Sequence, residues 1–215
     1  MLFDLDGVLV HSMPLHMKAW DRYLAQFGMS CGELERVMHG KRNSELVRQL
    51  FGDGLAEEVI FEHGAAKERL FREMLLEKDL SVCRVEGLTE FLERHKETPK
   101  AIASNAEPAN IDFVIDRLGL RAYFRVIVDG QQVSRPKPFP DVYLRAAEQL
   151  GFAPKECIVF EDSPTGVAAG VAAGMRVVAV ETTPTEFEAV DLTVRDFSDP
   201  KLEEWLGMLQ RALPC

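Results

Sequence analysis

Asp4 and Asp6 stand on alternate residues directly after the apolar run at residues 1–3. Side chains two residues apart lie on the same face of an extended chain, so we expect both carboxylates to project together. Repulsion between them should raise the pKa of one of the two. Such a pair suits a reaction in which one carboxylate attacks or binds a cation and the other transfers a proton. The alternative is an acidic turn that closes a strand, with Gly7 supplying unusual backbone angles.

A hydroxyl and an amide follow a second apolar run, at Ser104 and Asn105, just before a predicted helix. Together with the backbone N–H groups of the helix N-terminus, these side chains could hold a phosphate. Either residue could equally cap the helix, because a side-chain oxygen at that position accepts an unpaired backbone N–H.

Two charged motifs come later in the chain. Lys137 stands between two prolines that stiffen its loop, although a solvated loop lysine is a common alternative. Glu161 and Asp162 end another apolar run, where Asp162 could also act as a helix cap. Because Mg²⁺ prefers oxygen ligands in octahedral geometry, these acids and Asp4 could share a hard-cation site.

Apolar runs and helical patterns alternate from about residue 86 onward, which predicts βαβ units around a parallel sheet. Only three residues precede Asp4, so we expect either a short first strand or residues missing before Met1. The strands are expected at residues 2–5, 100–103, 123–128, 157–160 and 176–180. The helices of this part are expected at residues 108–118, 140–150, 164–173 and 201–213.

Residues 13–80 differ from the rest, because they carry helical periodicity without a convincing strand. The predicted helices there cover residues 13–28, 33–38, 44–51 and 56–77. A helical block inserted after the first strand would lie above the carboxyl ends of the strands, where open parallel sheets bind ligands. The sequence therefore predicts an α/β fold with a helical insertion beside its site.

Composition and charge restrict the classes of partner and the cellular location that we expect. The 215 residues carry a formal net charge of −10, and the absence of a dense Lys/Arg run argues against nucleic-acid or anionic-membrane partners. The four cysteines form no metal-binding spacing, which favours reduced thiols in the cytosol. No apolar run reaches the roughly 18 residues of a membrane span, and no signal peptide precedes Asp4, so we expect a cytoplasmic protein.

The four motifs, in this order, resemble those of the haloacid dehalogenase superfamily of phosphohydrolases. The stretches at residues 137–143 and 160–169 are similar to the β-phosphoglucomutase-like branch, and the resemblance runs over essentially the whole chain. It implies a Rossmann-like parallel sheet core with an inserted small all-helical cap domain. We expect residues 1–12 and 81–215 to form that core and residues 13–80 to form the cap.

The resemblance also implies roles for the core residues. Asp4 would be the nucleophile that accepts the phosphoryl group, and Asp6 the general acid and base. Lys137 and Ser104 would contact the transferring oxygens, while Asn105 could serve either the phosphate or the helix cap. A carboxylate that attacks a phosphate monoester meets another anion, so such a site needs compensating positive charge.

Mg²⁺ would supply most of that charge. The resemblance implies that Asp4, the main-chain carbonyl of Asp6 and Asp162 hold the ion. Glu161 would orient these ligands, directly or through water.

In this family the cap sets substrate specificity. His16 and Trp20 lie one helical turn apart and match a pair that contacts the active site, although they could equally be cap core. Lys41 and Arg42 resemble the cap loop that reaches the substrate, where they could meet a second anionic group or remain a solvated turn. Lys67 lies near the position of a substrate-facing lysine in the mutases.

We therefore expect a Mg²⁺-dependent phosphatase that hydrolyses a small phosphorylated metabolite, such as a sugar phosphate, through an aspartyl-phosphate intermediate. We expect the protein to be a monomer or weak dimer. The main alternative is a β-phosphoglucomutase-like phosphomutase, in which a sugar hydroxyl instead of water takes the phosphoryl group. A phosphonate hydrolase with a Schiff base at Lys67 and a catalytically silent binding protein are weaker alternatives.

Two positions depart from the family pattern. His11 stands where an aspartate is usual, which alters the hinge into the cap but leaves Asp6 intact. Pro108 stands about where the mutases carry an asparagine, which favours hydrolysis over phosphoryl transfer to a sugar.

Overall fold

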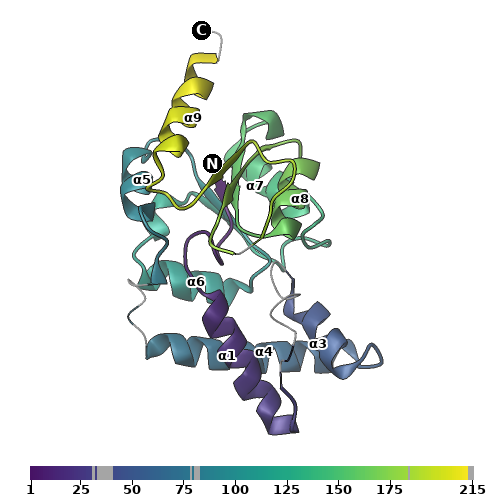
Figure 1. The fold of residues 1–215 in the computed structure, drawn as a ribbon. Helices are drawn as coiled ribbons and strands as arrows, with labels where there is room; N and C mark the ends of the chain where they lie inside the picture. Colours follow the sequence, from purple (N-terminus) through teal and green to yellow (C-terminus); the bar gives the residue numbers. More distant parts are fainter. Residues whose placement is uncertain (31, 33–40, 78, 80–82, 184, 213–215) are drawn as a thin grey trace.

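The computed structural model describes residues 1–215 except 31, 33–40, 78, 80–82, 184 and 213–215. Within the described chain, six strands form one parallel sheet in the order β3-β2-β1-β4-β5-β6 (Figure 1). The strands are β1 (Leu2–Phe3), β2 (Ala101–Ala103), β3 (Val126–Val128), β4 (Ile158–Glu161), β5 (Arg176–Val180) and β6 (Leu192–Val194). The two-residue β1 lies in the middle, where it pairs with β2 and β4.

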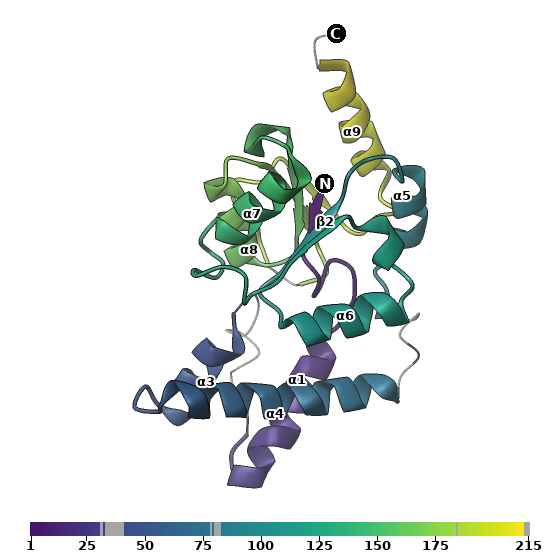
Figure 2. The same ribbon diagram turned by 180° about the vertical axis from the view of Figure 1, so that it is seen from behind.

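Helices cover both faces of this sheet (Figures 1 and 2). One face packs against α5 (Leu88–Arg94), α6 (Pro108–Arg117) and α9 (Pro200–Ala212). The other face packs against α7 (Asp141–Leu150) and α8 (Pro164–Ala172). Successive strand residues point to opposite faces, and accordingly Leu2 belongs to one buried cluster and Phe3 to the other.

Aromatic rings fill the cluster that contains Phe3. Phe3 is fully buried and stacks on Phe160 with ring centroids 4.6 Å apart, while Phe124 meets it edge-on at 5.7 Å. These contacts hold β1 against β4 although β1 contributes only two residues to the ladder.

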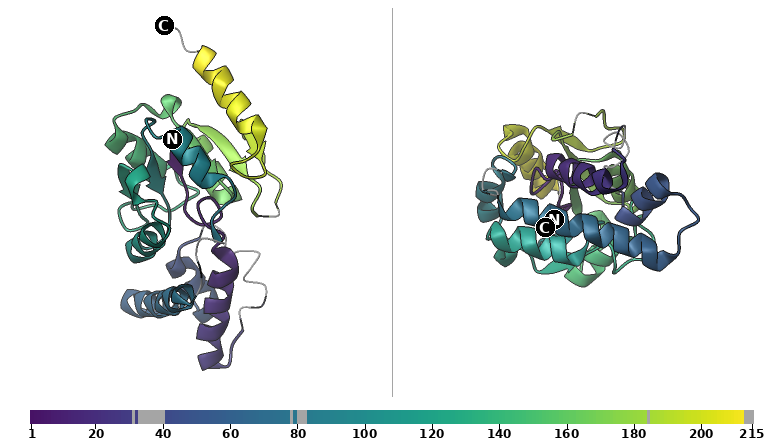
Figure 3. Two further views of the ribbon diagram at one scale, coloured as in Figure 1. Left: turned by 90° about the vertical axis from the view of Figure 1, so that its left-hand side faces the viewer. Right: turned by 90° about the horizontal axis from the view of Figure 1, so that it is seen from below.

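Within the described residues, the segment predicted to form the cap contains α1 (Met13–Leu24), α3 (Asn43–Phe51) and α4 (Glu57–Leu76), and we call these helices the cap. These helices have a core of their own, built around Trp20, Leu46 and Ile60. Figure 3 shows them at one end of the molecule, beyond the carboxyl ends of the strands. The extension predicted for the first cap helix to residue 28 is a 3-10 turn (Ala25–Phe27) that ends at Gly28.

The predicted α/β class and parallel sheet are confirmed, and β5 has the predicted bounds. The first strand ends at Phe3, two residues before the prediction. Helix α5, with seven residues, and strand β6, with three, were not predicted. The helix predicted at 33–38 lies outside the described residues. No described helix is long and apolar enough to cross a membrane.

We expect Phe3→Ala to lower the free energy of unfolding by about 3–5 kcal/mol, because it empties the centre of a packed aromatic cluster. Phe61 is 64% exposed, so the control Phe61→Ala should change that free energy by at most about 0.5 kcal/mol. Urea unfolding followed by circular dichroism measures both. Equal losses in the two variants would contradict the role of Phe3.

Candidate active site

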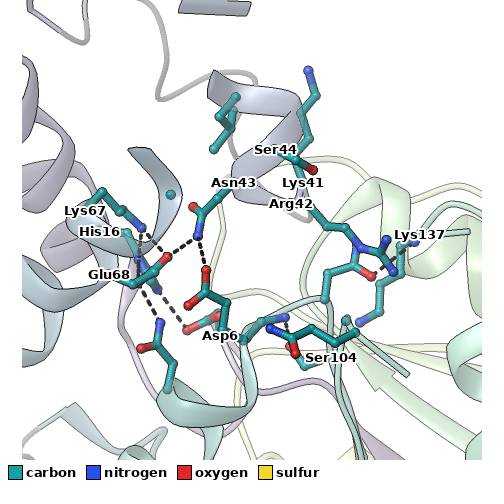
Figure 4. Close-up of a pocket in the computed structure, with 18 of the residues that line it drawn as sticks. Asp6, His16, Lys41, Arg42, Asn43, Ser44, Lys67, Glu68, Ser104 and Lys137 are labelled. Carbon is teal, nitrogen blue, oxygen red and sulfur yellow. Dashed lines mark hydrogen bonds and ion pairs between the residues drawn. The ribbon is translucent and has the colours of Figure 1, made fainter. Parts of the chain in front are cut away.

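A cavity of about 350 Å³ lies between the carboxyl ends of the strands and the cap. Every site residue predicted from the sequence lines it, with the exception of Glu161. Core and cap side chains face each other across this cavity in Figure 4. Its volume lies in the range of small-molecule binding sites.

The strand order explains how the core residues meet. Asp4 follows β1, Ser104 follows β2 and Glu161 ends β4, and these three strands are neighbours in the sheet. The backbone N–H of Asp4 donates to the carbonyl of Phe160 at 3.1 Å, which continues the ladder up to the nucleophile candidate.

Three buried carboxylates gather at this edge of the sheet. Asp4, Glu161 and Asp162 each offer an oxygen within 4.8 Å of the others. Burial raises the pKa of Asp4 to about 7, with Lys137 opposing the rise and Glu161 and Asp6 adding to it. Burial and the charge of Glu161 raise the pKa of Asp162 well above its usual range. The single charge of Lys137 therefore does not fully compensate the three acids.

The donor set fits a divalent cation with oxygen ligands, because such an ion would compensate the crowded acids. Gly7 lets Asp162 approach, since a Cβ at Gly7 would lie 1.9 Å from Asp162 Oδ2. That same oxygen accepts a hydrogen bond from Thr183 Oγ1 at 2.6 Å. Asp4 and Asp162 could therefore hold such an ion, and the hydrogen bond from Thr183 fixes the carboxylate of Asp162.

Lys137 is a buried cation inside this cluster. Its Nζ lies 2.8 Å from Asp4 Oδ1 and 2.6 Å from Glu161 Oε1. Tyr143 Oη also donates to Glu161 Oε1, at 2.5 Å. The other oxygen of Glu161 accepts the backbone N–H groups of Asp162 and Ser163. Glu161 thus anchors Lys137 and the Asp162 loop, in keeping with an orienting role.

Asp6 differs from the sequence-based expectation, because its carboxylate does not join the cluster of three. Its Oδ1 accepts the hydroxyl of Ser12 and lies 3.4 Å from His16 Nε2. The strand ends at Phe3 and Gly7 has a φ of +78°, so the two-residue period does not extend to Asp6. Burial alone would raise the pKa of Asp6, but His16 and Ser12 lower it overall.

Ser104 and Asn105 both shape the loop beyond β2. Ser104 is buried, and its Oγ accepts the N–H of Ala106 at 3.3 Å. Asn105 Oδ1 accepts the N–H of Lys137 at 3.3 Å, which ties the Lys137 loop to the end of β2. The N-cap position of α6 is Glu107, so the alternative that Ser104 or Asn105 caps this helix is wrong, and both residues line the cavity instead.

On the cap side, His16 and Lys67 form a buried pair. Lys67 Nζ lies 2.7 Å from His16 Nδ1, and the His16 ring stacks on Phe71 with centroids 3.7 Å apart. Trp20 is fully buried in the cap core and also lines the cavity, 5.3 Å from Lys67 Nζ. His16 therefore connects the cap to Asp6.

The cap loop carries two half-buried cations that line the cavity. Arg42 Nη2 donates to the carbonyl of Val133 in the core at 3.0 Å. Lys41 Nζ lies 3.4 Å from Gln49 Oε1 in an exposed contact within the cap. Arg42 thus joins cap and core.

Sequence reasoning missed Ser12, Glu68, Tyr143 and Thr183 as residues of this site. Thr183 lies just beyond β5, so the strand-end rule that identified Ser104 would also have found it. Glu68 has no comparable signal, because charged residues are frequent on long helices.

Comparison with known proteins gives consistent matches. Residues 1–180 match the model of a family described as haloacid dehalogenase-like hydrolase. The fructose-1-phosphate phosphatase YqaB of Escherichia coli is 30% identical over 84% of this chain and 95% of its own length. The β-phosphoglucomutase of Mycobacterium bovis is 30% identical over 92% of this chain and 89% of its own.

A solved structure agrees with these matches. The crystal structure of a HAD hydrolase, family IA, variant 3, from Entamoeba histolytica is 26% identical, with a TM-score of 0.86. The similarity covers 97% of this chain and 98% of that one. Both the core and the cap therefore have counterparts in this relative.

We expect Thr183→Val to raise the half-saturating Mg²⁺ concentration for phosphate release by about 10- to 100-fold, because Asp162 loses the donor that orients it. Titration of activity with Mg²⁺ measures this shift. The matched control is Thr185→Val, since the hydroxyl of Thr185 donates to the carbonyl of its neighbour Glu186, at 3.5 Å. An unchanged half-saturating concentration in Thr183→Val would contradict the role of Thr183.

Proposed function

The chain belongs to the haloacid dehalogenase-like hydrolase family, and from this premise we propose that it is a Mg²⁺-dependent phosphatase of a small phosphorylated metabolite such as a sugar phosphate. The observation that carries the proposal is the buried contact of Lys137 with both Asp4 and Glu161 at the floor of a cavity beneath the cap. This arrangement can receive a phosphate group and place it beside a carboxylate nucleophile. We also propose a cytoplasmic location.

In the first half of the reaction, an Asp4 oxygen attacks the phosphorus atom. An aspartyl phosphate forms, and the bond from phosphorus to the leaving oxygen breaks as Asp6 gives that oxygen a proton. Lys137 offsets the negative charge that accumulates on the transferring oxygens, and Ser104 lies close enough to the cavity floor to contact them. Bound Mg²⁺, held by Asp4, the main-chain carbonyl of Asp6 and Asp162, would add Lewis-acid stabilisation.

In the second half, Asp6 takes a proton from water, and the water oxygen attacks the phosphorus of the aspartyl phosphate. The bond from phosphorus to Asp4 breaks, which releases phosphate and restores the free carboxylate. Ser12 and His16 hold the carboxylate of Asp6 in place for this role. The proton that Asp6 gains here is the one it donates in the next turnover.

A β-phosphoglucomutase-like phosphomutase remains the second candidate, because the Mycobacterium bovis relative carries that name. The two reactions share Asp4 and Asp6 and differ in the acceptor of the phosphoryl group. Incubation with a sugar 1-phosphate separates them, since free phosphate indicates hydrolysis and a 6-phosphate product indicates a mutase.

Two weaker alternatives have less support. A phosphonate hydrolase would need an uncharged Lys67 amine, whereas Lys67 Nζ lies 2.8 Å from Glu68 Oε1 in a buried ion pair. A silent binding protein would have no use for the full set of acids around Lys137.

We expect Asp4→Asn to lower kcat for phosphate release by at least about 10³-fold, because the amide cannot attack phosphorus. A panel of phosphorylated metabolites and p-nitrophenyl phosphate, assayed with and without Mg²⁺, measures the loss and identifies the substrate. The control is Asp112→Asn, whose exposed carboxylate pairs with Arg121 and does not line the cavity, and it should retain wild-type activity. Substantial hydrolysis by Asp4→Asn would contradict the assignment of the nucleophile.

A further inference from the structure

Core and cap meet along α6 of the core and α4 of the cap, which lie side by side in Figures 1 and 2. Asn110, in the first turn of α6, is only 2% exposed, and the proposed reaction assigns it no step. A buried polar side chain without hydrogen-bond partners costs free energy. The groups that Asn110 contacts therefore indicate what this residue does in the folded protein.

The amide of Asn110 contacts two side chains of the cap helix α4. Its Nδ2 donates to Glu68 Oε2 at 2.6 Å, and its Oδ1 accepts a hydrogen bond from Arg72 Nη1 at 2.6 Å. Glu68 and Arg72 lie four residues apart, so they share one face of α4. An ionised carboxylate only accepts and a guanidinium only donates, which fixes the orientation of the amide between them. Asparagine therefore matches this pair of opposite charges, whereas an aspartate in its place would bring a like charge against Glu68.

Glu68 connects this contact to the rest of the cap. Its other oxygen, Oε1, accepts hydrogen bonds from Asn43 Nδ2 at 2.7 Å and from Lys67 Nζ at 2.8 Å (Figure 4). Burial by itself raises the pKa of Glu68, but Lys67, His16 and a hydrogen bond from Asn43 lower it to about 2, so the carboxylate is ionised at neutral pH. Asn43 begins α3, and Lys67 contacts His16, which faces Asp6. A shift of Glu68 would therefore move both the start of α3 and the cap group that meets Asp6.

Close packing inside the cap supports this geometry. Gly64 lies in the middle of α4, one turn before Glu68, at a position where glycine destabilises a helix relative to alanine. A Cβ at Gly64 would lie 3.1 Å from Asn43 Cβ. The glycine thus lets the start of α3 approach α4 closely enough for Asn43 to reach Glu68. Cap helices α3 and α4 are therefore held to each other beside the residue that Asn110 contacts.

The hydrogen bond from Asn110 to Glu68 is short and buried. Another hydrogen bond between cap and core, from Arg42 Nη2 to the carbonyl of Val133, is 3.0 Å long and joins groups that are only partly buried. A hydrogen bond to a charged group is stronger than one between neutral groups, and a low local dielectric strengthens it further. The contact of Asn110 with Glu68 would be lost if the cap moved away from α6, so it favours the closed arrangement.

We propose that Asn110 is a positioning residue, which holds the cap closed over the cavity through Glu68 and Arg72 of α4. The inference deepens the proposed phosphatase function and rests on it. Closure keeps His16 beside Asp6, so the cap group that orients the proposed general acid and base stays in contact with it. Without the contacts of Asn110, the reacting groups would be intact but the closed arrangement would be less populated.

The test exchanges Asn110 for aspartate, which keeps the shape of the side chain but places a like charge against Glu68. We expect Asn110→Asp to raise KM for fructose 1-phosphate at least about tenfold and to change kcat by less than about threefold, because saturating substrate still closes the cap. A variant that was merely less stable would lose active protein, and therefore apparent kcat, at an unchanged KM. Ala109→Asp is the matched control, since it adds the same charge at the exposed neighbouring position of α6 and should keep the wild-type KM.

A double variant should reverse the effect. Glu68→Gln combined with Asn110→Asp exchanges amide and carboxylate across the contact and keeps the wild-type net charge, so KM should return to within about threefold of the wild-type value. The thermal unfolding midpoint shows whether each variant is folded. If Asn110→Asp does not fold, Arg72→Met replaces it, because Arg72 is only half-buried and its loss leaves the Asn110 oxygen without this donor. We then expect KM to rise about threefold or more.

Small-angle X-ray scattering follows the cap without turnover. In Mg²⁺ and inorganic phosphate, we expect a larger radius of gyration for Asn110→Asp than for the wild-type protein and Ala109→Asp. Any of four results would overturn the inference: an unchanged KM in Asn110→Asp, an equal rise in Ala109→Asp, no recovery in the double variant, or equal radii of gyration in Asn110→Asp and the wild-type protein. Absence of phosphate release by the wild-type protein from every compound would instead overturn the proposed phosphatase function, and the scattering would still test the role of Asn110.

Discussion

The structure depends on one costly arrangement, the burial of Asp4, Glu161 and Asp162 at the same edge of the sheet. Like charges so close together in a dry environment repel, and their burial is tolerable only with compensating positive charge. Lys137 supplies part of it through contacts with two of the three acids. The negative charge that Lys137 leaves uncompensated suits the site to a divalent cation, whose charge would also offset the repulsion between Asp4 and a phosphate. The short central strand β1, which packed aromatic rings hold in place, supports this cluster.

Core and cap divide the remaining work. The core fixes the charged groups through hydrogen bonds from loops beyond the strands, such as that from Thr183 to Asp162. The cap meets Asp6 through His16 and presents Glu68 to the cavity. Each domain on its own would leave the cavity open on one side.

The sequence was sufficient to predict the fold class and the residues at the strand ends. Its hydrophobic periodicity predicts a parallel sheet, and in such a sheet the carboxyl ends of the strands lie at one edge. It did not predict that the carboxylate of Asp6 turns toward Ser12, since that depends on the strand ending at Phe3. It also missed Glu68, whose role comes from Asn110, a contact between segments 42 residues apart. Local patterns carry no information about such pairings between distant segments.

We propose that Asp4 carries the phosphoryl group during the reaction, and direct chemical mapping of the phosphorylated residue tests this role. The protein is mixed with a hydrolysed substrate and Mg²⁺, quenched in acid during turnover, digested and analysed by mass spectrometry. We expect an acid-stable, hydroxylamine-labile phosphate on the peptide that contains Asp4, and no such phosphate in Asp4→Asn. A phosphate found on another residue, or turnover without any phosphorylated peptide, would contradict it.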